Sequence, residues 1–150
     1  MQVTSVSVQE SLLASGSQDE SAQVWNMRTQ QKLWHFRHDD EVNCVQLHEN
    51  WLITCSDDKS TRIWDLGNGK LLHRLEQSNL CNNLDISPNK SLMAIATRDE
   101  LVLLDLLKTK TIQKFNLGPR HNDVRFSPSG KRLVVGLSGG EVFKIDLVFD

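Results

Sequence analysis

The chain has 150 residues, a length that fits about one globular domain. The net charge is −2, and lysines and arginines are scattered rather than interleaved with aromatic residues, which argues against nucleic acid as a partner. Three cysteines, an odd number, predict buried free thiols in a reducing compartment rather than a disulfide framework. No transmembrane run or signal peptide is evident, so we expect a cytoplasmic and/or nuclear protein with no membrane partner.

Four segments of the chain end alike. They are Val24-Trp25-Asn26, Ile63-Trp64-Asp65, Leu104-Asp105 and Ile145-Asp146, and they follow one another at spacings of 39, 40 and 41 residues. A fixed period of this size indicates an array of one repeated structural unit.

Alternation of apolar and polar residues, bounded by turn-forming residues, predicts β-strands along the whole chain. No window of 11 or more residues keeps a helical period. The expected strands are 3–8, 12–17, 22–26, 32–36, 42–47, 51–56, 61–65, 71–75, 81–86, 92–97, 101–106, 111–116, 122–127, 132–137 and 141–146.

The repeated unit resembles that of the WD-repeat (WD40) family. Leu13–Asp19 and Leu52–Asp58 align, and each is followed by four residues and then by the pair that ends in Trp25 or Trp64. The resemblance covers essentially the whole chain and implies an all-β fold made of β-propeller blades, each with four antiparallel strands. The expected blades are approximately 1–36, 42–75, 81–116 and 122–150.

The strand count bears on closure of the ring. The expected strands lack the outermost strand of the last blade, while propeller rings hold about four to eight complete blades. We therefore expect part of a longer propeller with an incomplete ring of about four blades. A closed ring of four blades, or two copies that pair into one ring, are the alternatives.

The resemblance also implies a structural tetrad, a hydrogen-bonded set of four side chains in the second blade. A tryptophan indole only donates, a carboxylate only accepts, and a neutral histidine does both, so such a set can satisfy all its members. Ser56 lies on the same face as Thr54 and is a substitute for it. The tetrad positions are His38, Thr54, Asp58 and Trp64 in the second blade and Ser15, Asp19 and Trp25 in the first.

The third and fourth blades replace the whole set, because a half-satisfied buried network is worse than an apolar core. Only Asp99 survives, and we expect it to cap its own turn. The four positions hold Gln77, Ile95, Asp99 and Leu104 in the third blade and Leu117, Val135, Gly139 and Ile145 in the fourth.

A catalytic or metal site is the alternative interpretation of these polar residues. Thr54, His38 and Asp58 are the residue types of a hydrolase catalytic triad. A histidine that is held in a structural hydrogen-bond network, however, is not free to act as a general base. His35 and His38, three apart on an extended chain, point to opposite faces and do not converge on a metal. We therefore predict no catalytic residue, no metal and no cofactor.

The resemblance implies that loops at one end of the blades form the docking surface, and loops in general carry function more often than cores. The candidate protein-binding residues there are Arg37, Asp39, Asp40, Glu41, Asp57, Lys59, Arg98 and Arg120.

One further candidate lies at the end of the first repeat. The segment from Leu12 to Arg28 resembles the sixteen-residue box by which some WD-repeat proteins engage the cullin-4 ubiquitin-ligase adaptor. The box ends Trp-Asp-x-Arg, and here Asn26 stands in place of the aspartate while Arg28 is kept.

The sequence therefore predicts a non-enzymatic scaffold whose partners are other proteins, with no small-molecule substrate. The alternative is a substrate receptor of a cullin-RING ubiquitin ligase, acting through the Arg28 box or through an F-box region upstream.

Overall fold

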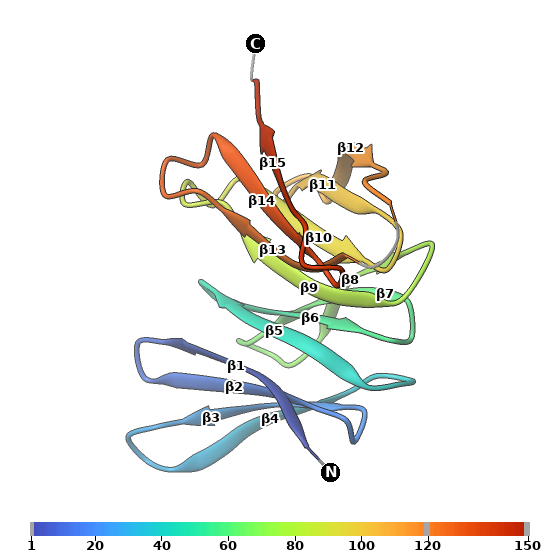
Figure 1. Ribbon diagram of the computed structural model, residues 1–150. Coiled ribbons are helices and arrows are strands. Elements are labelled where there is room, and N and C mark those ends of the chain that lie inside the picture. The colour runs from blue at the N-terminus through green and yellow to red at the C-terminus, as the bar shows by residue number, and fades with distance from the viewer. Residues whose placement is uncertain (1, 119–120, 149–150) are drawn as a thin grey trace. The chain divides into compact units, whose positions relative to one another are not determined.

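The computed structural model describes residues 2–118 and 121–148. In these residues the chain forms fifteen β-strands in four antiparallel sheets (Figure 1). The chain divides into two compact units, Met1–Cys81 and Asn82–Asp150, with the boundary at the first residue of β9. No helix in the described residues is long and apolar enough to cross a bilayer.

Each sheet is a meander in which consecutive strands are neighbours. The first sheet contains β1 (Val3–Gln9), β2 (Leu12–Ser17), β3 (Ser21–Asn26) and β4 (Gln31–Arg37). The second sheet contains β5 (Val42–His48), β6 (Trp51–Ser56), β7 (Ser60–Asp65) and β8 (Leu71–Glu76). The third sheet contains β9 (Cys81–Ile86), β10 (Leu92–Thr97), β11 (Leu101–Asp105) and β12 (Lys110–Phe115).

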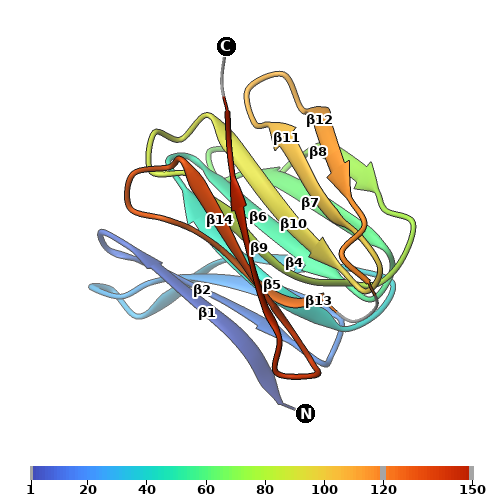
Figure 2. The ribbon, with the colours of Figure 1, turned by 45° about the horizontal axis from the view of Figure 1, so that its top comes forward.

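The fourth sheet has three strands in the described residues, in the orange to dark red part of the ribbon (Figure 2). They are β13 (His121–Phe126), β14 (Arg132–Leu137) and β15 (Val142–Asp146). The prediction of an all-β fold built from four-stranded antiparallel units is confirmed, and every strand bound lies within one residue of the expected one.

The first hairpin turn of every sheet shares one backbone feature, although the residues differ. The turn between the first two strands of each sheet has a residue with positive φ: Glu10 (53°), Glu49 (53°), Lys90 (60°) and Gly130 (72°). Because a residue with positive φ recurs in this turn as glutamate, lysine or glycine, this feature of the repeat does not depend on residue identity.

An apolar cluster joins the first and second sheets within the first unit. Close approach of the sheets depends on small residues: a Cβ on Gly16 would lie 2.9 Å from side-chain carbons of Val42 and Val45. The cluster consists of Ala14, Ala22, Val24 and Phe36 from the first sheet and Val42, Val45, Leu47, Leu52 and Trp64 from the second.

A second apolar cluster joins the third and fourth sheets within the second unit. Its buried members are Leu92, Ala94, Ala96, Leu101 and Leu103 from the third sheet and Val124, Leu133 and Val135 from the fourth. Both units are thus built by packing one sheet face against the next.

Candidate protein-interaction site

The structure brings the four expected residues of the second sheet into one hydrogen-bonded chain. His38 follows β4, Thr54 lies on β6, Asp58 lies in the β6–β7 turn and Trp64 lies on β7. His38 Nδ1 is 2.8 Å from Asp58 Oδ2, and His38 Nε2 is 2.7 Å from Thr54 Oγ1. Trp64 Nε1 donates to the same Thr54 oxygen at 3.0 Å.

These partners assign the protons on His38. Its Nδ1–H donates to the Asp58 carboxylate, and its Nε2 accepts the Thr54 hydroxyl proton, while the Thr54 oxygen accepts from Trp64. Burial lowers the pKa of His38 below its ordinary value, although the Asp58 carboxylate acts in the opposite direction. The histidine is therefore neutral near pH 7, which is the state that satisfies every member.

Asp58 accepts more hydrogen bonds than the one from His38. The Ser60 amide and hydroxyl donate to Asp58 Oδ1 at 2.9 and 2.6 Å, and the Asp39 amide donates to Oδ2 at 3.1 Å. Burial alone would raise the pKa of this carboxyl, but the bonds from Ser60, the Asp39 amide and His38 together hold it well below its usual value. Asp58 is thus a permanent anion at the centre of the network.

Arg62 extends this network, and the sequence analysis missed it. The buried guanidinium donates to Asp58 Oδ2 at 2.6 Å and to Asp39 Oδ2 at 2.8 Å. It also donates to the Arg37 carbonyl at 2.9 Å, and its Nε donates to the Ser60 hydroxyl at 3.0 Å. Arg62 therefore neutralises Asp58 and ties the β6–β7 turn to the loop after β4.

A sequence signal for Arg62 was available. On a strand, residues two apart share a face, so Arg62 lies on the same face as Trp64. It also follows the turn residue Asp58 by four positions. A cation on the network face, close to a buried carboxylate, is a predictable ion-pair partner.

Ser56 has a different role from the expected one. Its hydroxyl accepts from the Asp58 amide at 3.0 Å and donates to the Asp40 carbonyl at 3.1 Å. It fixes the loop conformation, while Thr54 contacts the histidine.

In the first sheet the structure retains only the turn part of the arrangement. Asp19 accepts from the Ser21 amide at 3.0 Å and from its hydroxyl at 2.5 Å, as Asp58 does from Ser60. The hydroxyl bond from Ser21 lowers the pKa of Asp19. No hydrogen bond joins Ser15 to Trp25 in the described residues; instead Lys32 Nζ lies 5.0 Å from the Trp25 ring centre.

In the third and fourth sheets, apolar residues occupy several of these positions. In the fourth sheet, Val135 is buried in the second apolar cluster and Ile145 packs against it. In the third sheet, Asp99 accepts a hydrogen bond from the Thr97 hydroxyl at 3.1 Å, within its own turn.

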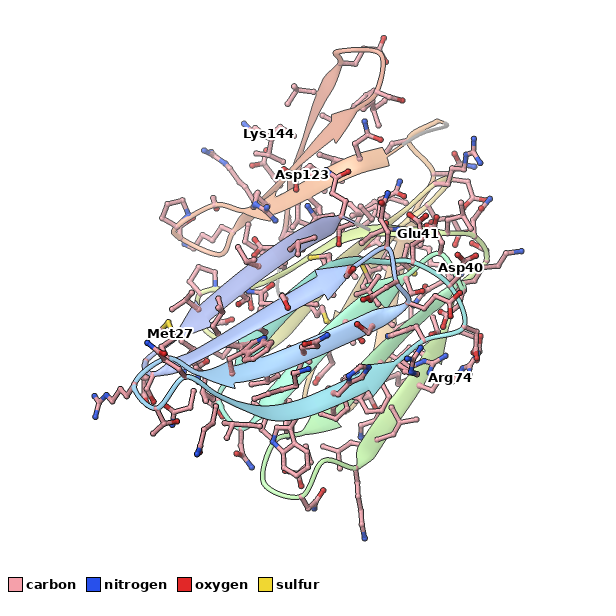
Figure 3. The ribbon with its side chains drawn as sticks, turned by 90° about the horizontal axis from the view of Figure 1, so that it is seen from below. Met27, Asp40, Glu41, Arg74, Asp123 and Lys144 are labelled. Atoms are coloured by element: carbon pink, nitrogen blue, oxygen red, sulfur yellow. The ribbon has the colours of Figure 1, made fainter. Side chains whose placement is uncertain are left out.

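The candidate binding residues of the first unit gather at one end of the second sheet. The Asp57 amide donates to the Glu41 carbonyl at 3.0 Å, which joins the β6–β7 turn to the loop after β4. Asp39 is mostly exposed and lies 3.5 Å from Arg74 Nη1 as well as pairing with Arg62. Figure 3 shows Asp40, Glu41 and Arg74 together at this end.

The remaining candidates differ in exposure and in their contacts. Arg37 and Lys59 are exposed, Asp57 accepts from the Asn43 amide nitrogen at 2.6 Å, and Arg98 is exposed in the β10–β11 turn. Arg120 lies outside the described residues.

Arg28 follows Met27 in the turn between β3 and β4, at the end of the first sheet away from the loop after β4. Figure 3 shows Met27 far from Asp40. Asn26 Oδ1 accepts from the Arg28 and Thr29 amides at 2.9 and 3.2 Å. Asp65 accepts from the Gly67 amide in the same way at 2.7 Å. Asparagine therefore caps this turn as aspartate does, and the Arg28 side chain is exposed.

Cys44, Cys55 and Cys81 are buried thiols outside any disulfide, as predicted. Burial raises the pKa of Cys55 well above its usual value and that of Cys81 to about 12, so neither is a reactive thiolate near neutral pH. In the described part of the chain no group of three or more His, Cys, Asp or Glu side chains is placed to hold a metal ion.

The repeated sheets define the class of protein as a β-propeller. Residues 1–104 match the family model described as nucleolar protein 10-like, N-terminal domain, and the chain belongs to this β-propeller family. The WD-repeat-like propeller predicted above is confirmed at the level of the fold. Propellers of this kind are typically non-enzymatic and mediate protein–protein interaction.

Two solved structures share this fold at low identity. The computationally designed Ika4 protein is 20% identical, with a TM-score of 0.88 over 98% of this chain and 92% of that one. The computationally designed Ika8 protein is 21% identical, with a TM-score of 0.86 over 97% of this chain and 46% of that one. The chain thus spans less than half of Ika8. No curated protein matches it.

Proposed function

We propose that this propeller is a non-catalytic scaffold that binds another protein at the loop end of the second sheet. The observation that supports this most is the Arg62 network. It holds the exposed Asp39 in a defined place and thereby orders the loop that carries Asp40 and Glu41. An ordered surface loses less conformational entropy on binding than a flexible one.

The chemistry of the network disfavours catalysis at the same residues. Thr54 is fully buried, and its oxygen already contacts both His38 and Trp64. A substrate carbonyl cannot reach this hydroxyl, so the arrangement serves as a staple rather than as a nucleophile and base.

Charge substitutions at the loop end test the scaffold. Asp40→Lys should abolish binding of a partner recovered by cross-linking to the wild-type protein, without changing the thermal midpoint. Lys70→Glu is the matched control, because Lys70 is exposed at the opposite end of the same sheet. This variant should bind the partner as the wild type does. Unchanged binding by the Asp40 variant and by an Arg37→Glu variant would contradict this location.

The second candidate function is that of a substrate receptor for a ubiquitin ligase, through Arg28. The favouring observation is that Asn26 preserves the turn geometry of an aspartate and leaves the guanidinium exposed. An exposed arginine presented by a capped turn can pair with a carboxylate on an acidic adaptor surface.

Arg28→Ala tests this candidate. It should leave the melting temperature unchanged and abolish co-purification with the cullin-4 adaptor, because losing a hydrogen-bonded charge at an interface costs about 2–5 kcal/mol. Lys70→Ala should retain the adaptor. If the wild-type chain itself does not bind the adaptor, the likeness of this segment to the box is coincidental and only the scaffold remains.

We also propose that the protein works in the nucleus, since the family is named for a nucleolar protein. Imaging of the tagged protein in cells provides the test, and exclusion from the nucleus would contradict it.

A further inference from the structure

A hollow of about 320 Å³ lies in the second unit, between the outer strands of the third sheet and the end of β15 with the residues after it. Its lining is apolar apart from Gln113 and Asp146, and the apolar residues include Leu103, Phe115 and Leu147. Ligand pockets in proteins have volumes of about 300–1,000 Å³. The hollow is therefore at the lower end of this range, with room for one aromatic side chain.

At the corresponding place in the first unit, an indole side chain fills the space between two sheets. Trp34 donates from its indole nitrogen to the Leu66 carbonyl at 3.0 Å. Its ring stacks on that of Phe36, with ring centroids 6.2 Å apart. Trp34 and Leu66 both pack against the first apolar cluster. The first unit thus shows which kind of side chain fits between sheets of this architecture.

Strand pairing identifies Gln113 as the counterpart of Trp34. Trp34 on β4 is paired with Val24 on β3, and Gln113 on β12 is paired with Leu103 on β11. A register shift lies next to each pair, and Val24 and Leu103 are each buried in the apolar cluster of their unit. The second unit therefore has a glutamine where the first unit has a tryptophan.

The walls of the space correspond as well. Phe36 and Phe115 lie two residues beyond Trp34 and Gln113, on the same face of their strands. The amides of Leu66 and Leu147 each donate at 2.8 Å to a carbonyl of the first hairpin turn of their sheet. Phe36 is buried, whereas Phe115 is only partly buried. The second unit thus retains the walls and lacks the ring that covers them.

The hollow arises from this exchange of tryptophan for glutamine. The side chain that fills the space in the first unit comes from β4, and its counterpart Gln113 comes from β12, so both lie inside the described residues. Gln113 is exposed to solvent. The position that an indole would occupy in the second unit is consequently open to a side chain from outside.

The strand beside the hollow favours an extended polypeptide as the source of that side chain. β12, orange in Figure 2, is the edge strand of the third sheet, and its first five residues are exposed. An extended segment can pair with such an edge through its backbone. Side chains directly opposite each other on paired strands lie on the same face. A residue opposite Gln113 would therefore lie on the face that borders the hollow.

We propose that the hollow binds a tryptophan side chain of a partner protein, presented by an extended segment that pairs with β12. The indole takes the place that Trp34 has in the first unit, with its ring on Phe115 and its N–H donating to the Leu147 carbonyl. This site is separate from the loop end of the second sheet, and binding at one does not require binding at the other.

Nuclear magnetic resonance titration of the 150-residue chain with a strand-forming peptide tests the site. The probe is the peptide Thr-Val-Trp-Val-Thr, acetylated and amidated at its ends. It should shift the amide signals of Leu103, Gln113 and Leu147. The same peptide with alanine in place of tryptophan should bind at least about tenfold more weakly, because it loses the buried ring and the indole hydrogen bond. N-acetyl-tryptophan amide should be weaker by a similar factor, because it cannot pair with β12.

Gln113→Trp is the decisive variant. Its own indole should fill the hollow as Trp34 does in the first unit, so the thermal midpoint should stay unchanged or rise while peptide binding weakens by at least about tenfold. Gln113→Ala leaves the hollow open and is the matched control, which should bind the peptide as the wild type does. Phe115→Leu keeps an apolar wall without the ring, and should weaken binding by about three- to tenfold even if the tryptophan variant does not fold.

Three results would overturn the proposal. In the first, the peptide shifts no amide signal of the third and fourth sheets up to its solubility limit. In the second, a folded Gln113→Trp variant binds the peptide as tightly as the wild type, or the alanine peptide binds as tightly as the tryptophan peptide. In the third, N-acetyl-tryptophan amide binds as tightly as the peptide, which would make the hollow a site for a free aromatic molecule rather than for a protein segment.

Discussion

His38 and Arg62 show how single residues hold the second sheet. His38 bridges a hydroxyl and a carboxylate, and Arg62 supplies the charge that lets the carboxylate stay buried and ionised. Neither residue's hydrogen bonds contribute much to the free energy of unfolding one by one, because a typical hydrogen bond contributes only about 0.5–1.5 kcal/mol net. The larger effect is the one that follows removal of a partner, when a buried polar group is left unsatisfied.

The first prediction concerns coupling between His38 and Trp64. His38→Ala and Trp64→Ala should each lower the free energy of unfolding by about 2–4 kcal/mol, since each removes one of the buried hydrogen-bond partners of Thr54 and also removes packing. The double variant should lose less than the sum, because both residues bond to Thr54. Urea unfolding of the four proteins gives the coupling energy. Additive losses below about 0.5 kcal/mol each would show that the two residues are not coupled.

The second prediction concerns Arg62. Arg62→Met keeps most of the side-chain volume but removes the cation from Asp58, and should destabilise the protein by about 3–5 kcal/mol, as expected when one partner of a buried ion pair is removed. Arg125→Met removes an exposed arginine that pairs with Asp123, and should change stability by less than about 1 kcal/mol. Equal effects of the two substitutions would mean that burial of Arg62 is unimportant.

At the scale of elements, the β7–β8 turn joins the two sheets of the first unit. Trp34 on β4 donates from its indole nitrogen to the Leu66 carbonyl at 3.0 Å. Gly69, in the same turn, has φ of 71°, and a Cβ there would lie 2.2 Å from the Trp34 ring. The turn of one sheet thus closes over an aromatic side chain of the other, and only glycine fits.

Gly69→Ala gives the third prediction. It should destabilise the protein by about 2–4 kcal/mol, because the new methyl group collides with Trp34 and the backbone is left-handed. Gly139→Ala is the control: nothing lies within 4 Å of its added Cβ, so its effect should stay within about 0.5 kcal/mol. Thermal unfolding followed by tryptophan fluorescence measures both. A neutral Gly69 variant would contradict the close packing of this turn.

At the scale of the whole molecule, the two units use different chemistry for one architecture. The first unit contains the polar network around His38, whereas the fourth sheet of the second unit has Val135 and Ile145 at equivalent positions. A fully satisfied polar network and an apolar replacement are both stable solutions for a buried position. The units should therefore respond differently to pH.

The fourth prediction follows from the lowered pKa of His38. Unfolding returns this histidine to a pKa of about 6.5, so below that pH the unfolded state binds a proton that the folded state does not bind. Stability of Met1–Cys81 should thus fall as pH drops below about 6.5, by at most about 1.4 kcal/mol per pH unit. A second loss, from the lowered pKa of Asp58, should follow below about pH 4.

Hydrogen exchange, corrected for the intrinsic effect of pH, measures this. Protection should decrease in β5–β7 between pH 7.5 and 5, and less so in β13–β15. His38→Gln should remove the first stage, since glutamine does not titrate. Equal loss of protection in both units would contradict an origin at His38.

Much of the architecture was predictable from the sequence, because alternation has a period of two and turns need particular backbone angles. Alternation predicted the fifteen strands of the described residues, and the period grouped them into repeats. The resemblance grouped His38, Thr54, Asp58 and Trp64, which hydrogen bonds join in the structure. These properties are local or periodic along the chain, so the order of residues in the sequence is enough to reveal them.

Contacts between distant side chains were decided only by the tertiary structure. Arg62 reaches Asp39 and the Arg37 carbonyl across a gap of more than twenty residues, and Ser56 bonds to Asp40 rather than replacing Thr54. The sequence likewise could not tell that, in the part of the chain that the structure describes, no hydrogen bond joins the side chains of Ser15 and Trp25. Nor could it tell that Val6 and Val142 are exposed while residues at equivalent positions of other sheets are buried. Burial and hydrogen-bond geometry depend on which sheet packs on which, and this is a property of the folded chain rather than of any one repeat.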